Sequence, residues 1–92
     1  MENPLTLHLL ISGRVQGVYF RKFTREQADS LGVHGYVRNL PNGRVEAVLS
    51  GEAECVRQME QELKVGPPNA SVTGVASAEV SFHPFEKFGV RR

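Results

Sequence analysis

The sequence has little of what stabilises secreted or membrane proteins. It contains one cysteine, Cys55, and no tryptophan among 92 residues. A lone cysteine excludes a disulfide within the chain, so we expect a reducing compartment and a cytoplasmic protein. The longest apolar runs fall far short of the ~20 residues that a membrane-spanning helix needs, so we expect no membrane partner.

The chain also lacks an excess of charge of either sign. Lys and Arg number 11 and Asp and Glu number 10, which leaves a net charge of +1. That balance provides no broad positive field for a long polyanion. The segments 5–12 and 44–50 contain none of the aromatic residues on which an RNA-binding sheet stacks bases. We therefore expect no nucleic-acid partner, whereas a small anion held by local groups fits the composition.

Clusters of metal ligands are missing too. The three histidines, His8, His34 and His83, are dispersed and have no cysteine pair nearby. We accordingly expect no metal and no cofactor. A chain of 92 residues is too short for two cores, so residues 1–92 should form a single domain.

What the sequence does have is clear periodicity. Alternation of apolar and polar residues predicts strands, and apolar residues at helical spacing predict helices. Gly32 suits the left-handed position after a helix, and Asn42-Gly43 is a strong hairpin signal. The predicted strands are 5–12 (ended by Gly13), 33–40, 44–50, 72–82 and a short piece within 85–90, and the predicted helices are 20–31 and 52–64.

This order, β-α-β-β-α-β with a short terminal strand, predicts an α+β fold. A split β-α-β arrangement of this kind makes a ferredoxin-like sandwich, in which two helices cover one face of an antiparallel sheet. Because that topology hosts many functions, the function must be argued from a site.

The most informative segment is Gly13-Arg14-Val15-Gln16-Gly17-Val18-Tyr19-Phe20-Arg21. Glycines at 13 and 17 allow positive φ and close approach of a ligand, and successive N–H groups in such a loop can form an anion-binding nest. The following helix adds its free N–H groups, and Arg21 adds a guanidinium that binds two phosphate oxygens at once. The segment predicts a phosphate or phosphoryl site. On spacing alone, a tight turn with a solvated arginine is the alternative.

Asn39 is the second candidate. It shares a predicted strand face with Val33 and Val37, where an unpartnered amide is costly. One interpretation is that Asn39 positions a water or a ligand oxygen. The other is that its side chain bonds to the turn at Pro41-Asn42-Gly43.

Taken together, these residues resemble the acylphosphatase family. The segment from Gly13 to Arg21 resembles the first family signature, and Gly35-Tyr36-Val37-Arg38-Asn39 followed by Asn42-Gly43-Arg44-Val45-Glu46 resembles the second. Gly66-Pro67-Pro68-Asn69-Ala70-Ser71-Val72 is similar to the loop after the second helix, and residues 85–92 resemble the terminal strand. One departure is Lys87, where the family often has glycine. Lysine there would be strained if that position needs positive φ.

The resemblance implies the ferredoxin-like fold and hydrolysis of the carboxyl-phosphate bond of acyl phosphates, with inorganic phosphate as a product. It also implies a monomer that needs no metal. The catalytic arginine corresponds to Arg21 and the catalytic asparagine, which orients water, to Asn39. The phosphate-binding loop corresponds to Val15, Gln16, Gly17, Val18, Tyr19 and Phe20.

The residues agree with such a substrate. The carboxylate leaving group of an acyl phosphate has a pKa of about 4–5, so it departs without a general acid. A site with neither paired carboxylates nor metal ligands can then suffice, because phosphoryl transfer needs mainly positioning and charge stabilisation. The alternative is a non-catalytic module of the same fold that binds phosphate or carbamoyl phosphate.

Overall fold

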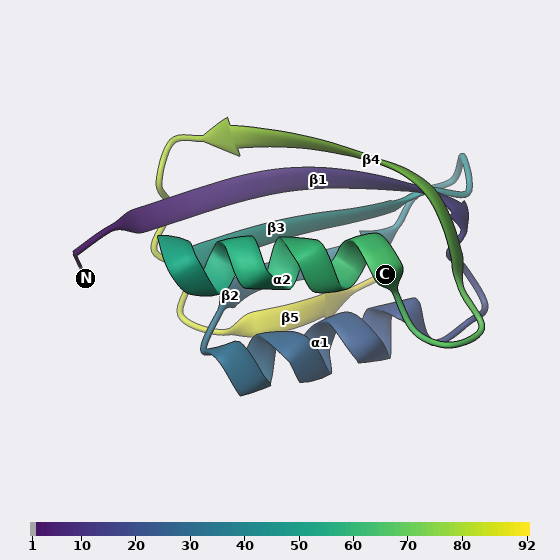
Figure 1. Ribbon diagram of the computed structural model, residues 1–92, viewed down its shortest axis with the longest axis horizontal. Helices are drawn as coiled ribbons and strands as arrows, with labels where there is room; N and C mark the ends of the chain where they lie inside the picture. The colour runs from purple at the N-terminus through teal and green to yellow at the C-terminus, as the bar shows by residue number, and fades with distance from the viewer. Residues whose placement is uncertain (1) are drawn as a thin grey trace.

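The elements follow one another in the predicted order. A computed structural model describes residues 2–92 (Figure 1). Helix α1 (Phe20–Leu31) has the predicted bounds, and Gly32 takes the left-handed conformation after it, with φ of 68°. The elements are β1 (Pro4–Arg14), α1 (Phe20–Leu31), β2 (His34–Asn39), β3 (Val45–Glu52), α2 (Ala53–Val65), β4 (Ser71–Val80) and β5 (Phe88–Arg91).

The five strands form one sheet in the order β4-β1-β3-β2-β5. The pairs β1–β3, β1–β4 and β2–β3 are antiparallel, as expected, but β5 pairs parallel to β2. The expectation of a wholly antiparallel sheet was therefore wrong at this edge. The chain leaves β4 at the end of the sheet where β1 and β2 begin. It crosses to the opposite edge there, so β5 must run in the direction of β2.

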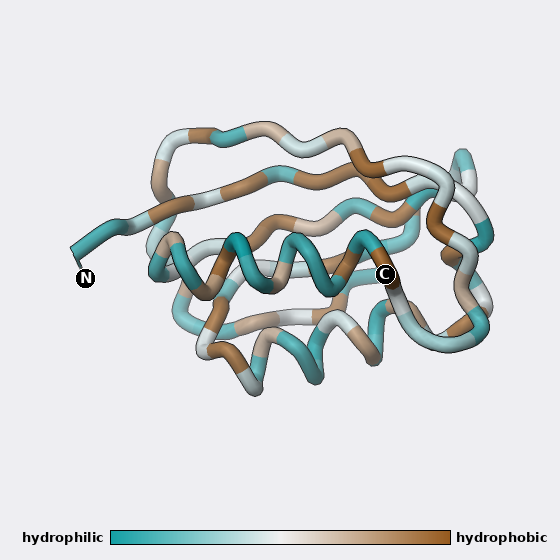
Figure 2. The backbone as a smooth tube through the Cα atoms, in the orientation of Figure 1, coloured by the Kyte–Doolittle hydropathy of each residue, from teal (hydrophilic) through white to brown (hydrophobic). Residues whose placement is uncertain are grey.

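Both helices lie on one face of the sheet, as predicted (Figure 1). The strand residues that face them alternate with polar ones, and Figure 2 shows the resulting apolar positions along the strands. Within residues 2–92, neither helix is long and apolar enough to cross a membrane. The buried core includes Leu5, Leu7, Leu9 and Ile11 of β1, Val37 of β2, Val45, Ala47 and Leu49 of β3, Phe20 and Ala28 of α1, and Val56, Met59 and Leu63 of α2.

Gly13 does not end β1, contrary to the sequence-based expectation. The strand continues to Arg14, and its register with β4 shifts between Ser12 and Gly13. Gly13 has φ of 118°, and a Cβ placed there would lie 2.1 Å from the carbonyl oxygen of Ser71. Glycine is therefore required here by the close approach of β4 at a bulge.

The terminal strand begins later than expected because residues 81–87 cross the sheet face opposite the helices. Phe85 packs edge-on against Tyr36, with ring centroids 6.1 Å apart. Lys87 has no positive φ, since Tyr19 is the sole non-glycine residue with one in the described chain. The carbonyl of Lys87 accepts a hydrogen bond from the amide of Gly35 at 3.1 Å, so lysine fits this position without backbone strain.

The same open face carries a charged cluster. Glu46 of β3 contacts His8 of β1, with Nε2 and Oε2 2.9 Å apart, and pairs with Arg38 of β2. Burial alone would raise the pKa of Glu46, but the hydrogen bonds from His8 and Arg38 outweigh burial and lower it. The fold therefore favours the ionised form of the Glu46 carboxylate, on the sheet face away from the helices.

Candidate active site

Three segments meet at one end of the molecule, on the right in Figure 1: the β1–α1 loop, the start of α1 and the end of β2. Together with Val90 of β5 and Arg92, they line a cavity of about 570 Å³. Arg21 and Asn39, which are 18 positions apart in the chain, both line it. The complete lining is Val15, Gly17, Tyr19, Phe20, Arg21, Lys22, Arg25, Asn39, Val90 and Arg92.

The loop between β1 and α1 is anchored by its apolar side chains. Val15 and Val18 are buried, at 1% and 4% exposure, and both belong to the core. Gly17 lies between them with φ of 73° and open space where a Cβ would be. The side chains of Val15 and Val18 thus anchor the loop to the core, while the backbone of Gly17 remains accessible at the cavity.

Gln16 fastens the loop from the side. Its Nε2 donates to the carbonyl oxygens of Leu40 at 2.8 Å and Arg44 at 2.9 Å. These two residues close the β2–β3 hairpin, since the amide of Leu40 also donates to Arg44. Because Leu40 directly follows Asn39, Gln16 fixes the loop relative to Asn39. The Gln16 side chain therefore serves the scaffold, and neither Gln16 nor Val18 is part of the cavity lining.

Helix α1 begins with free backbone donors at the cavity. Its N-cap is Tyr19, which has φ of 63° and makes no side-chain capping bond. The first helical hydrogen bond runs from the amide of Phe23 to Tyr19, so the amides of residues 20–22 precede it. No acidic residue occupies this first turn. An anion at this helix start would meet N–H groups and the positive end of the helix dipole.

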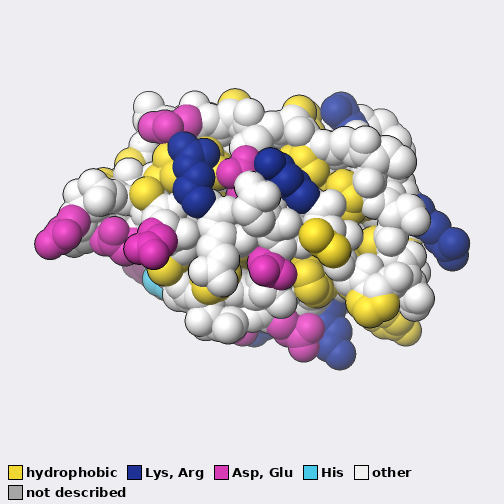
Figure 3. Space-filling model, in the orientation of Figure 1, with side chains coloured by type: hydrophobic (Ala, Val, Ile, Leu, Met, Phe, Trp, Pro, Cys, Tyr) yellow, Lys and Arg dark blue, Asp and Glu magenta, His cyan; other side chains and the backbone are white. Residues whose placement is uncertain are grey.

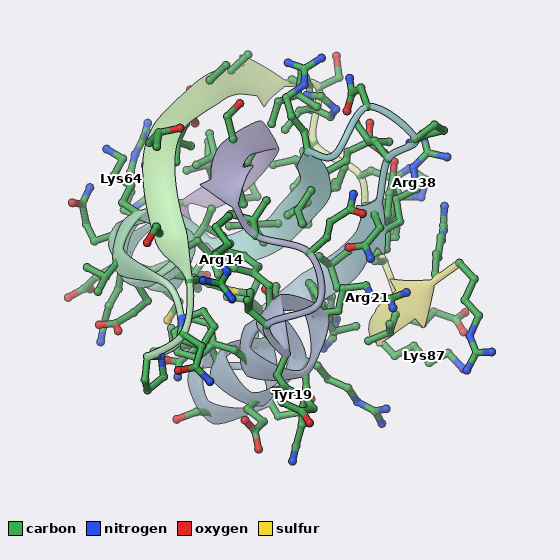
Figure 4. The ribbon with its side chains drawn as sticks, turned by 90° about the vertical axis from the view of Figure 1, so that its right-hand side faces the viewer. Arg14, Tyr19, Arg21, Arg38, Lys64 and Lys87 are labelled. Atoms are coloured by element: carbon green, nitrogen blue, oxygen red, sulfur yellow. The ribbon has the colours of Figure 1, made fainter. Side chains whose placement is uncertain are left out.

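Arg21 lies in this first turn, beside β5 (Figure 4). Its Nη1 donates to the carbonyl of Arg91 at 3.2 Å, and the side chain is half-buried. Within residues 2–92 no carboxylate lies within ion-pairing distance of it. One of the five guanidinium N–H donors is thus used to orient the side chain, and the others are available to a ligand.

Asn39 is the last residue of β2 and pairs with Val45 of β3. It is half-buried and, among the described residues, its side chain has no hydrogen-bond partner. The hairpin turn is closed instead by Asn42, whose Oδ1 accepts the amide of Arg44 at 3.0 Å. The interpretation that Asn39 bonds to the turn is therefore wrong, and its amide is directed to a cavity rather than used internally.

Three further cations border the same cavity, and the sequence reasoning missed them. Lys22 and Arg25 follow Arg21 on α1, and Arg92 follows β5, whereas no Asp or Glu among residues 2–92 lines the cavity. The sequence could have indicated the cations of α1, because residues 21, 22 and 25 are spaced so that they project from neighbouring parts of one helix surface. Elsewhere in the part of the chain described, no three His, Cys, Asp or Glu side chains gather where they could hold a metal ion.

The fold and this cavity define a small α+β domain with a cluster of cations and free backbone amides at a loop and helix start. The family model of the acylphosphatases matches residues 7–90. An acylphosphatase of Nitrosococcus oceani is 54% identical over 82 residues, covering 89% of this chain and 92% of that protein. One of Acaryochloris marina is 47% identical over 92 residues, covering 100% of this chain and 99% of that protein.

Solved structures agree with the sequence comparison. An acylphosphatase from Coxiella burnetii superposes with a TM-score of 0.93 at 38% identity, covering 98% of this chain and 95% of that one. The chain belongs to the acylphosphatase family. The predicted resemblance, fold class and enzyme activity are thereby confirmed, and the binding-module alternative is not favoured.

Proposed function

We propose that the loop 15–20 and Arg21 hold the phosphoryl group of an acyl phosphate, and that Asn39 holds the water that attacks it. The observation that carries this proposal is the convergence of Arg21, Asn39 and the free amides of the α1 start on one cavity. Each of the three has donors that the fold leaves unused. A phosphoryl group, with three equatorial oxygens, is the ligand whose shape and charge such donors match.

The division of work follows from the chemistry of the substrate. Negative charge spreads over the phosphoryl oxygens in the transition state, and preorganised N–H donors and a guanidinium stabilise it there. The leaving carboxylate has a pKa of about 4–5 and needs no proton from the protein. Asn39 accepts from and donates to water through its amide, so it can orient the nucleophile in line with the leaving group.

The reaction balances without a base from the protein. The water oxygen forms a bond to phosphorus, the bond from phosphorus to the acyl oxygen breaks, and its electron pair leaves with the carboxylate. A phosphate oxygen of the substrate takes the water's proton. The products are a carboxylate and inorganic phosphate, and Arg21 contacts the latter until it leaves.

The wider setting is part of the same proposal. The cavity is built from a single chain, which supports a monomer as the working unit. The single thiol of Cys55 supports a reducing, cytoplasmic location. Acidic and basic side chains are interspersed on the surface that Figure 3 shows, which is consistent with a small-molecule substrate rather than a nucleic acid.

The proposal is tested by measuring the hydrolysis of benzoyl phosphate, monitored by the loss of its absorbance, with the wild-type protein and with Asn39→Ala. We expect wild-type turnover. For Asn39→Ala we expect a large loss of kcat, with inorganic phosphate still inhibiting at similar concentrations because Arg21 and the loop are intact. Asn69→Ala, which replaces an exposed asparagine outside the cavity, is the matched control and should behave as wild type. Lost phosphate binding with normal kcat would remove Asn39 from the water-positioning role.

A further inference from the structure

The cavity extends beyond what a phosphoryl group requires. Its volume of about 570 Å³ lies within the ~300–1,000 Å³ typical of pockets for whole small molecules. In the proposed function, the phosphoryl group occupies only the part bounded by the loop, the α1 start and Arg21. The remaining part has room for the acyl group, so the residues that border it can discriminate between acyl groups.

That remaining part is bordered by positive charge. Lys22, Arg25 and Arg92 line the cavity together with Arg21, and no side-chain carboxylate of the described residues joins them. The whole chain has a net charge of only +1, so this concentration is local. Clefts lined by one sign of charge raise the local concentration of oppositely charged ligands.

These cations are not used by the fold. Arg25 has one acidic neighbour, Asp29, at 4.0 Å, and both side chains are largely exposed, at 61% and 68%. Such an exposed pair contributes little. Within residues 2–92, Lys22 and Arg92 have no ion-pair partner. The phosphoryl group needs Arg21 and the backbone amides, which leaves these three charges without a role in holding it.

We propose that Lys22 and Arg25 form a second anion subsite, which favours acyl phosphates whose acyl group ends in another anionic group. In-line attack places the water and the acyl group on opposite sides of phosphorus. The proposed water holder, Asn39, comes from β2, and Arg92 follows β5 on the same side because β5 pairs with β2 as far as Arg38 and Arg91, whereas Lys22 and Arg25 come from α1. A carboxylate or phosphate at the far end of the acyl group would meet these cations. This inference rests on the proposed function, because it takes the phosphoryl position as given.

Two substrates that differ in this one charge test the proposal. Succinyl phosphate ends in a carboxylate, and butyryl phosphate has a chain of similar length that ends in a methyl group. We expect kcat/KM of the wild-type protein to be about three- to tenfold higher for succinyl phosphate, the size that a few exposed charge contacts produce. The preference should shrink in 0.5 M salt, because the contacts are exposed.

The double variant Lys22→Gln/Arg25→Gln should bring the ratio of the two kcat/KM values close to one. Arg57→Gln/Lys64→Gln removes the same charge from α2, outside the cavity, and should keep the wild-type ratio. An unchanged ratio in the Lys22/Arg25 variant, or no preference in the wild type, would overturn the subsite. Failure of the proposed function would look different, since neither substrate would then be hydrolysed.

Discussion

Removing the side-chain amide of Gln16 should loosen the site while leaving Arg21, Asn39 and the backbone amides of the loop in place. Gln16→Met keeps the length of the side chain but deletes both hydrogen bonds to the β2–β3 hairpin, which are 2.8 and 2.9 Å long. Each such bond contributes about 0.5–1.5 kcal/mol, so the free energy of unfolding should fall by about 1–3 kcal/mol. In a domain of this size, ~1 kcal/mol corresponds to a Tm change of about 4–8 °C.

The effect on turnover separates this scaffold role from a general loss of stability. At a temperature where Gln16→Met is fully folded, we expect kcat/KM for benzoyl phosphate to fall, because the loop and Asn39 no longer keep a fixed separation. Urea unfolding and steady-state kinetics measure the two effects on the same sample. Gln58→Met, on the exposed surface of α2, is the control and should change neither. A Gln16→Met protein with wild-type Tm and wild-type kcat/KM would refute the reasoning.

Further predictions concern Glu46 on the open sheet face and the two glycines at positions 13 and 17. Because folding lowers the pKa of Glu46 below its ordinary value of 4.5, the contacts of Glu46 with His8 and Arg38 stabilise the protein above that pH, and this contribution is lost as pH falls through the folded-state pKa. Glu46→Gln should therefore remove that part of the acid-side slope when the free energy of unfolding in urea is measured against pH, and an unchanged slope would contradict the assignment. Gly13→Ala should destabilise by at least ~2 kcal/mol, since its Cβ would meet a backbone oxygen at 2.1 Å. Gly17→Ala meets no such clash, so it should lower the free energy of unfolding by less, ~1–2 kcal/mol. Because Gly17 lines the cavity, this variant should also weaken phosphate binding. Urea unfolding and phosphate titration compare the two glycine variants, and equal losses of stability would contradict their different roles.

The sequence predicted most of the fold because local patterns and long-range packing agree in this chain. The apolar spacing of residues 20–31 gave the bounds of α1, since both its core-facing side chains and its terminal Gly32 are local signals. Gly13 shows where local signals fail. A glycine after an alternating strand is ordinarily a stop, and the bulge became evident only with β4 alongside it.

Long-range geometry explains the other differences. The parallel pairing of β5 depends on which edge of the sheet the chain reaches after β4, and no local pattern in residues 81–91 specifies that. In the site, the chemistry of Arg21 and Asn39 made them candidates and the family resemblance gave them their expected roles, and the structure brings both to one cavity. The bonds of Gln16 could not be predicted in the same way, because its partners lie 24 and 28 residues further along the chain.

The most direct test of the central claim is kcat/KM of the Arg21→Ala variant for benzoyl phosphate, measured on protein whose fold is verified by urea unfolding. Losing a preorganised donor to the developing charge typically costs ~3–4 kcal/mol, which corresponds to a rate loss on the order of 10²–10³. We therefore predict a loss of at least that size, accompanied by loss of inorganic phosphate binding. A folded Arg21→Ala protein that kept more than half of the wild-type kcat/KM would contradict the claim that Arg21 holds the phosphoryl group.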